Sequence, residues 1–258
     1  MSDAQLVRIE KEGRIARIVM EAPPLNALTL PMLDQILAAY RSCAADEGVR
    51  AVILCSALEK IFCAGLDLKL LREAGAEGVR ALLQKLYLDM LDVQHTMGKP
   101  TISAVSGAAR GGGMTLSITC NVIVADESAT FGYPELDNGL IPAIHFVHLP
   151  RVIGKHRAFD LLFTGRSFDA HEAERIGLVA RVAKGKGVMD CAMELAESFA
   201  RQPPRATRIA HANFMRAQDM EFRREVADVT ETFINVSQTE ETQAGLAAFA
   251  EKRTPPWR

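Results

Sequence analysis

Residues 101–125, which read TISAVSGAARGGGMTLSITCNVIVA, contain the pattern that decides the fold. A short apolar run at 101–105 leads into a glycine-rich turn at 107–113, and an apolar stretch then leads to a second short run at 121–125. Continuous apolar runs of this length are typical of strands that are buried on both faces. The pattern therefore predicts a strand, a turn, a helix and another buried strand in succession.

The same alternation extends towards the N-terminus. Two alternating runs at 6–9 and 15–20 are joined through Gly13, as in a hairpin. Thr29 is an expected N-cap because it precedes a helical repeat of apolar residues, and residues 51–55 (AVILC) are typical of a buried strand. A second helical stripe contains Val79, Leu82, Leu86, Met90 and Val93. Alternating strands and helices indicate crossover connections and a largely parallel sheet covered by helices.

The pattern changes in the last quarter of the chain, where no strand signal follows residues 178–182. Helical stripes remain, and the last of them contains Phe222, Val226, Val229, Phe233 and Val236. An apolar helix face must be covered, and either a groove of the same chain or a neighbouring subunit would do this. We therefore expect a core over residues 1–195 and a helical C-terminal region over residues 196–258.

Composition excludes several classes of protein. The 258 residues include 30 Lys+Arg and 32 Asp+Glu, with 48% hydrophobic and 24% charged residues, which disfavours disordered, collagen-like and coiled-coil chains. A net charge of −2 without a long basic run disfavours a nucleic-acid or anionic-membrane surface. The start of the chain lacks the apolar segment of a secretory signal, and no run has the ~20 apolar residues of a membrane helix. A cytoplasmic location is therefore expected.

The cysteine pattern predicts reduced thiols in the core. The chain has an odd number of cysteines and no C-x-x-C pair, which argues against a disulfide framework or structural zinc. Cys63 alone lies beside a glycine-containing turn, and a packing role is favoured over a nucleophile because no basic residue is near it in sequence. The five cysteines are Cys43, Cys55, Cys63, Cys120 and Cys191.

Two glycine-containing turns carry the strongest chemical signal. Residues 62–69 (FCAGLDLK) and residues 107–113 each follow a strand and each lead into a helix. The first N–H groups of a helix have no internal partner and lie at the positive end of its dipole, and glycine lets a ligand approach them. Two such turns at one sheet edge would aim two donors at one developing negative oxygen, as in an oxyanion hole. Close helix–strand packing is the alternative explanation for the glycines.

Six segments resemble, in the same order, the crotonase superfamily of enoyl-CoA hydratases and isomerases. They are FCAGLDLK at 62–69, RGGG at 110–113, ATFGYPE at 129–135, LLFTGR at 161–166, AERIGLV at 173–179 and FAEKR at 249–253. The resemblance covers nearly the whole chain and implies an α/β fold, a crotonase-like spiral of ββα units with a helical C-terminal region. It also implies an acyl-CoA substrate, assembly into homo-trimers or dimers of trimers, and no metal or cofactor beyond the coenzyme A of the substrate.

The resemblance assigns coenzyme A contacts to four residues. The carbonyl of Ala64 would meet the adenine end, and Lys69 occupies a position that contacts CoA phosphate in relatives. Phe249 and Lys252 match a C-terminal pair that reaches the CoA of a neighbouring subunit.

The resemblance also assigns the catalytic groups. The N–H groups of Leu66 and Gly112 would polarise the thioester carbonyl. Hydratases of this family place two glutamates around the substrate; the second falls on Glu135, but Thr115, expected at the substrate, replaces the first. One carboxylate is enough for Δ3,Δ2-enoyl-CoA isomerases, which return the proton that they remove. The apolar segment around Glu135 independently predicts a raised carboxyl pKa.

A second departure lies at 141–150 (IPAIHFVHLP), where many hydratases have a glycine-rich stretch. The bulkier sequence predicts a reshaped acyl pocket and is similar to that of cyclic-dienoyl-CoA hydratases. His145 and His148 are three residues apart and could share a helix face. Ordinary packing, a pocket role for one of them, or metal binding are the alternative roles that the sequence allows. Asp137 is a candidate replacement for the lost carboxylate, and Arg110 is either a positioning residue or a surface charge.

We therefore expect an acyl-CoA enzyme of the hydratase/isomerase type, either a lyase or an isomerase. A relative that binds coenzyme A or associates with RNA, with little catalysis, is the alternative of a different class. Thr115 favours that alternative, whereas Glu135 and the small net charge argue against it.

Overall fold

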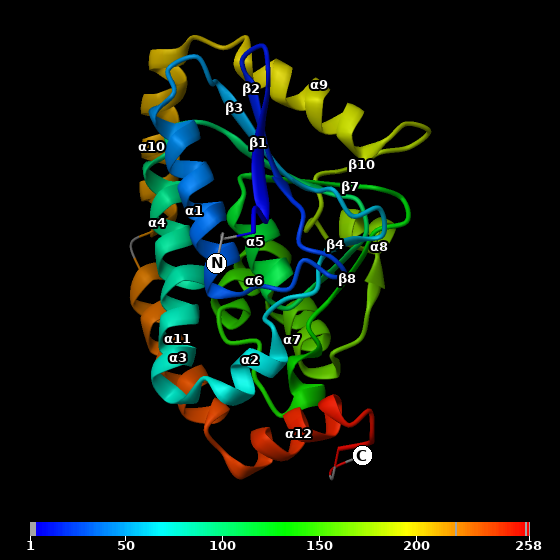
Figure 1. The fold of residues 1–258 in the computed structure, drawn as a ribbon. Coiled ribbons are helices and arrows are strands. Elements are labelled where there is room, and N and C mark those ends of the chain that lie inside the picture. Colours follow the sequence, from blue (N-terminus) through cyan, green and yellow to red (C-terminus); the bar gives the residue numbers. More distant parts are fainter. Residues whose placement is uncertain (1–3, 220, 256, 258) are drawn as a thin grey trace.

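The computed structural model describes residues 4–219, 221–255 and 257 (Figure 1). Its larger sheet has the strand order β1-β2-β3-β5-β7-β10, in which β1 is antiparallel to β2 and the remaining neighbours are parallel. The strands are β1 (Val7–Glu12), β2 (Ile15–Met20), β3 (Ala51–Ser56), β5 (Thr101–Val105), β7 (Val122–Ala125) and β10 (Arg181–Val182). The predicted hairpin, buried strands and largely parallel sheet are confirmed.

A smaller sheet, which the sequence patterns did not predict, has the order β4-β6-β8-β9. Its strands are β4 (Ile61–Cys63), β6 (Ala108–Arg110), β8 (Thr130–Gly132) and β9 (Phe168–Asp169). The glycine-rich segment 107–113 is thus a strand and a turn rather than a turn alone. Runs of two or three residues are too short to show an alternating pattern. Strands β3, β5 and β7 are each followed by a strand of the smaller sheet, so the chain winds as the expected spiral.

Helices cover both faces of the larger sheet. On β3, Val52 and Leu54 belong to the main core, whereas Ile53 and Cys55 pack with the residues of α9 (Val188–Ala200) on the other face. Strand side chains alternate between faces, which explains why the whole run is apolar. Figure 1 shows α1 (Leu30–Ala45) and α4 (Met90–Thr96) on one side of the sheet and α9 on the other. The Thr29 hydroxyl accepts the N–H of Met32 and caps α1, as predicted.

The second predicted helix is interrupted. The chain forms α2 (Leu68–Glu73), α3 (Gly75–Leu83), the π-helix η1 (Gln84–Asp89) and then α4. A π-turn adds a residue to the helical turn. The predicted stripe of Val79, Leu82, Leu86, Met90 and Val93 is buried throughout, and Tyr87 of the π-helix is buried beside Leu86.

The C-terminal helices cover the same chain. The stripe of α11 (Phe222–Ser237) packs against α3, η1 and α6 (His145–Ile153), so it lies in a groove of its own chain. Helix α12 (Glu240–Ala250) packs against α2 and the 3-10 helix η2 (Pro134–Asn138) at the lower end of Figure 1. The expected boundary at residue 195 lies inside α9, which packs on the sheet as one helix. The remaining helices are α5 (Gly112–Thr119), α7 (Lys155–Thr164), α8 (Ala170–Arg175) and α10 (Pro204–Asp219).

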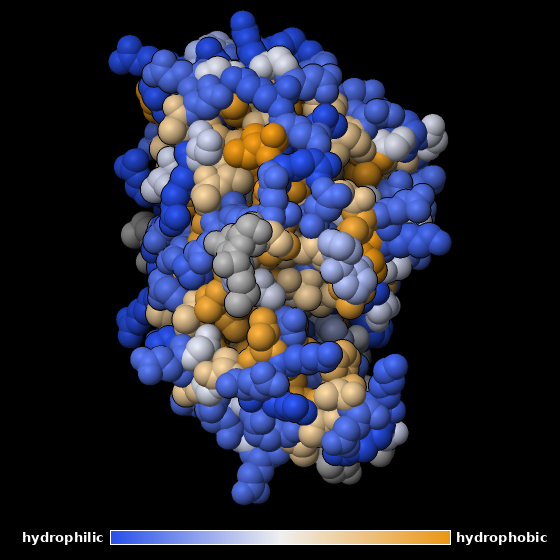
Figure 2. All heavy atoms as spheres, viewed as in Figure 1, coloured by the Kyte–Doolittle hydropathy of each residue, from blue (hydrophilic) through white to orange (hydrophobic). Residues whose placement is uncertain are grey.

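The face in Figure 2 is mostly hydrophilic, with smaller hydrophobic areas towards its centre. Within the described part of the chain, no helix is both long and apolar enough to cross a membrane. All five cysteines are free and buried. Burial raises the pKa of the Cys63 thiol to about 12, and its Sγ donates to the Asn26 carbonyl at 3.1 Å. These features agree with a packing role for Cys63.

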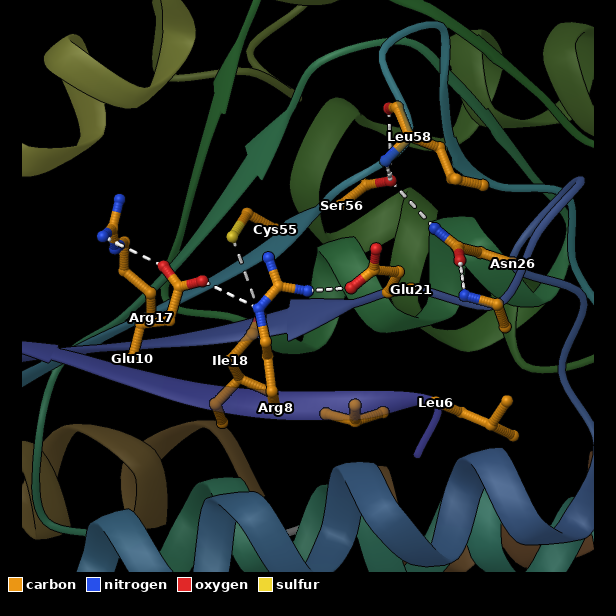
Figure 3. A network of polar contacts seen from close by, with 12 residues as sticks. Leu6, Arg8, Glu10, Arg17, Ile18, Glu21, Asn26, Cys55, Ser56 and Leu58 are labelled. Carbon is orange, nitrogen blue, oxygen red and sulfur yellow. Dashed lines mark hydrogen bonds and ion pairs between the residues drawn. The ribbon is translucent and has the colours of Figure 1, made fainter. Parts of the chain in front are cut away.

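Asn26 is a buried polar residue that ties the first glycine turn to the sheet. Its side-chain oxygen accepts the Ala22 N–H at 2.7 Å, and its amide nitrogen donates to the Ser56 hydroxyl at 2.8 Å (Figure 3). The amide nitrogen also donates to the Phe62 carbonyl at 3.0 Å. The loop that it fixes then pairs with the turn, since the N–H of Leu28 donates to the Gly65 carbonyl. Figure 3 also shows the separate ion pairs that Arg8 makes with glutamates on and beyond β1.

Asn26→Ala should lower the free energy of unfolding by about 2–4 kcal/mol, because it removes the side-chain partner of the Ala22 N–H and of the Phe62 carbonyl. Thermal and chemical unfolding would measure the loss. Asn213→Ala is the matched control, because Asn213 is exposed and bonds only within its own helix, to the Ile209 carbonyl. Equal stability of the two variants would show that the Asn26 network does not stabilise this loop.

Candidate active site

The two glycine turns meet. A Cβ built on Gly65 would lie 2.9 Å from the Arg110 carbonyl oxygen and 3.1 Å from the Gly112 nitrogen. Gly65 has a φ of +94°, a value that side-chain-bearing residues rarely adopt. Glycine is therefore required at 65 both by its conformation and by the approach of the second turn. The predicted convergence of the turns is observed.

The N–H groups of Leu66 and Gly112 lie at this meeting point. No acceptor within the described residues receives either N–H. Asp67 caps α2 by accepting the N–H groups of Lys69 and Leu70, which fixes the turn that contains Leu66. Gly112 is the first residue of α5 and follows Gly111, whose φ of 48° turns the chain from β6 into the helix. The site thus contains two unpaired donors, one of them at a helix N-terminus.

Glu135 approaches the second turn from η2. A Cβ built on Gly111 would lie 2.9 Å from its Oε1 atom, and its Oε2 atom is buried with no hydrogen-bond partner among the described residues. Burial raises the pKa of the carboxyl to about 7, and the negative charge of Asp137 contributes in the same direction. The raised pKa expected from the sequence is therefore supported by the packing around Glu135.

A cavity of about 70 Å3 lies between the two turns and Glu135. Leu86 and Tyr87 reach it from the π-helix, and Phe233 reaches it from α11. Glu135 is the only carboxylate among the described lining residues. The lining consists of Ala64, Gly65, Leu66, Leu68, Leu86, Tyr87, Gly111, Gly112, Pro134, Glu135, Asn138, Leu140 and Phe233. The arrangement offers one proton-transfer group and two backbone donors within an apolar surround.

Thr115 and Asp137 do not line this cavity. Thr115 is 1% exposed, and its hydroxyl lies 3.2 Å from Nε2 of His145, so the expected direct contact of Thr115 with substrate is not supported. Asp137 lies beside Gly165, where a built Cβ would be 3.6 Å from its carboxylate. It therefore affects Glu135 through its charge and does not supply the missing carboxylate at the cavity.

His145 and His148 are both buried on α6, as the shared-face expectation requires. The His148 ring stacks on Phe222 at 4.7 Å, and the His145 ring lies 4.6 Å from the Tyr133 ring. The described residues contain no group of three or more potential ligands that could hold a metal ion. The surroundings of both histidines are those of packed core residues.

Of the four residues expected to contact coenzyme A, one lines the cavity and three are exposed. Ala64 lines the cavity, and Lys69 is exposed in the first turn of α2. Phe249 is 56% exposed at the end of α12, and Lys252 is exposed just beyond it. Neither Phe249 nor Lys252 lines the cavity of its own chain.

Arg110 is a positioning residue within the smaller sheet. Its guanidinium donates to the Thr130 carbonyl at 2.7 Å and to the Thr130 hydroxyl at 2.9 Å. These bonds join β6, which leads to Gly111 and Gly112, to β8, which leads to Glu135. Arg110 therefore helps to hold the two halves of the site in register.

A larger cavity of about 270 Å3 lies elsewhere, among the ends of α1, α4 and α9. Lys99 donates there to the carbonyls of Cys43, Ala44 and Asp46 at 2.6–2.9 Å. These carbonyls end α1, so this cation offsets the negative end of a helix. The carboxylate that lines this cavity, Glu47, is exposed, unlike the buried carboxylate oxygen of Glu135.

Asn26, Tyr87 and Phe233 belong to the site or its support but were not predicted from the sequence. A buried asparagine has no sequence signal, and Phe233 was identified only as part of a helical stripe. Tyr87 could not be assigned to the cavity because the π-turn is invisible in a regular helical pattern.

Comparison with known proteins agrees with this geometry. The profile of the enoyl-CoA hydratase/isomerase family matches residues 10–258. The chain is 36% identical to a "Probable enoyl-CoA hydratase" of Rhizobium meliloti, with 95% of each chain covered. It is 34% identical to the "Short-chain-enoyl-CoA hydratase" of Clostridium acetobutylicum, covering 96% of this chain and 95% of that one.

A solved structure is similar over nearly its full length. The crystal structure of an enoyl-CoA hydratase from Bacillus anthracis has a TM-score of 0.79 and 32% identity, with 97% of this chain and 98% of that chain covered. The fold, the ordered motifs and these likenesses lead to one assignment. The chain belongs to the enoyl-CoA hydratase/isomerase family of the crotonase superfamily, whose members act on acyl-CoA substrates.

Proposed function

We propose that this protein moves a proton on an unsaturated acyl-CoA with Glu135 as its single base, while the N–H groups of Leu66 and Gly112 hold the thioester oxygen. The observation that carries the proposal is the position of Glu135, a carboxylate with a raised pKa beside two unpaired backbone donors. Such donors stabilise the negative oxygen of an enolate in a site that excludes water.

The preferred reaction is double-bond isomerisation of a 3-enoyl thioester. The Glu135 carboxylate takes a proton from C2, and the electrons of that C–H bond form a dienolate whose negative oxygen accepts the two N–H groups. The protonated Glu135 then returns the proton to C4, which leaves the double bond between C2 and C3. The atoms balance without a co-reactant, and the thioester serves as the electron sink, so the proposed step uses no metal or redox cofactor.

Hydration of a 2-enoyl thioester is the second candidate, favoured by the names of the relatives. Glu135 would take a proton from water as the hydroxide adds to C3, and would return it to C2. A cyclic dienoyl substrate is a variant of this reaction, suggested by the bulky segment 141–150. Isomerisation is preferred because Glu135 is the one carboxylate among the described residues that line the cavity.

Turnover of three thioester classes tests the proposal. Linear 3-enoyl, linear 2-enoyl and cyclic dienoyl thioesters would be followed by ultraviolet absorbance and product mass. Isomerisation creates the conjugated absorbance without a change of mass, whereas hydration removes it and adds one water. We expect the 3-enoyl substrate to react fastest. Thioester binding without turnover of any class would instead support the catalytically weak relative that binds coenzyme A or RNA.

Activity should rise with pH through an apparent pKa of about 7, because only the ionised Glu135 can accept a proton. A kcat/KM profile measures this value. Asp137→Asn should lower it, since the negative charge of Asp137 disfavours ionisation of Glu135. A wild-type profile that is flat from about pH 5 to about pH 8 would contradict the assignment of Glu135 as the base.

For coenzyme A itself, we propose contacts with the Ala64 carbonyl and Lys69, and with Phe249 and Lys252 of a neighbouring copy in a trimer or dimer of trimers. The exposure of Phe249 and Lys252, away from the cavity of their own chain, supports a role towards another subunit.

A further inference from the structure

The peptide between Gly111 and Gly112 has one end in the cavity and the other end in the core. Its C=O and N–H groups point in opposite directions because the peptide is trans. The Gly111 oxygen accepts the N–H groups of Met114 and Thr115 at 2.9 and 3.1 Å, inside the first turn of α5. The N–H of Gly112 is therefore directed away from the helix, on the side where Gly112 lines the cavity.

His145 reaches the core end of the same peptide. Its Nε2 atom lies 3.3 Å from the Gly111 oxygen and 3.2 Å from the Thr115 hydroxyl, and the side chain is 1% exposed. Burial lowers the pKa of the imidazole to about 3, so the ring is neutral and carries one proton.

The contacts decide which nitrogen carries that proton. Nδ1 of His145 is buried and has no hydrogen-bond partner among the described residues. A proton there would be an unpaired buried donor, and the lone pair on Nε2 would face the Gly111 oxygen. The proton is therefore assigned to Nε2, which donates to the Gly111 carbonyl and can also be shared with the Thr115 hydroxyl oxygen. The hydroxyl hydrogen of Thr115 can rotate away from the ring, whereas a proton on Nδ1 would be fixed in the apolar core.

We propose that His145 is a positioning residue that holds and polarises the Gly111–Gly112 peptide, and so strengthens the Gly112 N–H as a donor to the thioester oxygen. A hydrogen bond to the carbonyl oxygen of a peptide makes the N–H of that peptide a stronger donor. The inference rests on the oxyanion role proposed for Gly112 and adds to it a group that touches neither substrate nor cavity.

The packing of His145 makes it suited to this role. Its ring lies 4.6 Å from the Tyr133 ring and 6.3 Å from the ring of His148, which in turn stacks on Phe222. These contacts fix the His145 ring, so little conformational entropy is lost when its N–H donates to the Gly111 carbonyl during the reaction. The hydroxyl of Thr115 projects onto the His145 ring, and the short side chain leaves room for that ring beside the Gly111 carbonyl.

Two amide variants of His145 separate the effect of its hydrogen-bond donor from the effect of its side-chain volume. In His145→Gln the terminal amide is as many bonds from Cα as Nε2 and can donate to the Gly111 oxygen, whereas in His145→Asn it is in the position of Nδ1 and cannot. We expect His145→Asn to lower kcat about tenfold with KM changed less than about twofold, and His145→Gln to retain most of the activity. Unfolding curves of both variants would confirm that they are folded at the assay temperature.

A spectroscopic readout distinguishes this inference from the proposed function. The stretching frequency of a bound butanoyl-CoA carbonyl, isotope-labelled and measured by infrared difference spectroscopy, should fall on binding to the wild-type protein. The fall should be smaller in His145→Asn and should persist in His145→Gln and Thr115→Val.

No fall in the wild-type protein would contradict the oxyanion role itself. A wild-type fall that is unchanged in His145→Asn would overturn the role of His145 alone. Loss of the fall in Thr115→Val would show that the Thr115 hydroxyl, rather than the His145 N–H, sustains the polarisation, and would also overturn the inference.

Discussion

Glu135→Gln is expected to lower kcat by about 10²–10⁴-fold, the range that general acid–base catalysis contributes. The amide has nearly the same shape as the carboxyl group but cannot accept a proton from C2. Substrate binding should change little, because the backbone donors of Leu66 and Gly112 remain. Steady-state kinetics on the preferred thioester, together with the Kd of a saturated analogue, would separate the two effects.

The same variant should be more stable than the wild-type protein above neutral pH. The folded-state pKa of Glu135 is about 7, against an ordinary value of 4.5, so the folded protein holds this proton more tightly than the unfolded chain does. The contribution of protonated Glu135 to the free energy of unfolding is therefore fully present below about pH 4.5. This contribution is lost as the pH rises through about 7. The loss corresponds to about 3 kcal/mol, since each pH unit of difference is worth about 1.4 kcal/mol.

Unfolding of both proteins at about pH 5 and about pH 8 would measure this loss as the change in the stability difference between wild type and Glu135→Gln, in which the opposite contribution of buried His145 cancels. Glu59→Gln is the control, because Glu59 is exposed. It should change neither activity nor the pH dependence of stability. Full activity of Glu135→Gln would show that another group is the base.

Gly65→Ala is expected to have the second largest effect, a loss of about 10²–10³-fold in kcat, as when one oxyanion donor is removed. The added methyl group would lie 2.9 Å from the Arg110 oxygen and 3.1 Å from the Gly112 nitrogen. The two turns would have to separate, which moves the N–H of Leu66 away from that of Gly112. Kinetics and unfolding of the purified variant would report both consequences.

Gly75→Ala provides the matched control. Gly75 also has a positive φ, +59°, but a Cβ there would meet nothing within 4 Å. It should cost only about 1–2 kcal/mol of stability from its backbone conformation and leave kcat unchanged. If Gly65→Ala kept the activity of Gly75→Ala, the close approach of the turns would not be needed for catalysis.

The sequence was sufficient for features that depend on neighbouring residues. The buried strand at 101–105 and the N-cap at Thr29 are local, because an apolar run and a capping hydroxyl act over a few positions. The two glycine turns were also recognisable, since each joins a strand to a helix. Their motifs, with Glu135, led to the family that the comparisons support.

Local patterns failed where a single residue or a long-range contact decides the structure. The strands of the smaller sheet are too short for periodicity, and the apolar stripe from Val79 to Val93, although buried as predicted, gives no sign of the π-turn at Gln84–Asp89. The sequence allowed the apolar faces of the C-terminal helices to be buried either in a groove of the same chain or against a neighbouring subunit. Packing of α11 on α3, η1 and α6 selected the same chain.

The sequence by itself determined the alternation of strands and helices, the two turns and the candidate base, because hydrophobic period, glycine placement and a motif are written along the chain. The spiral of ββα units came from the resemblance to the crotonase superfamily. Only the tertiary structure decided that Gly65 contacts Gly112, that Glu135 is the one described carboxylate lining the cavity, and that Thr115 faces His145. The members of each contact are separated by tens of residues in the sequence. The distances between them therefore depend on how the two sheets and the helices pack. Packing also removes water from Glu135, and this desolvation, rather than the presence of a glutamate, gives the carboxyl its raised pKa.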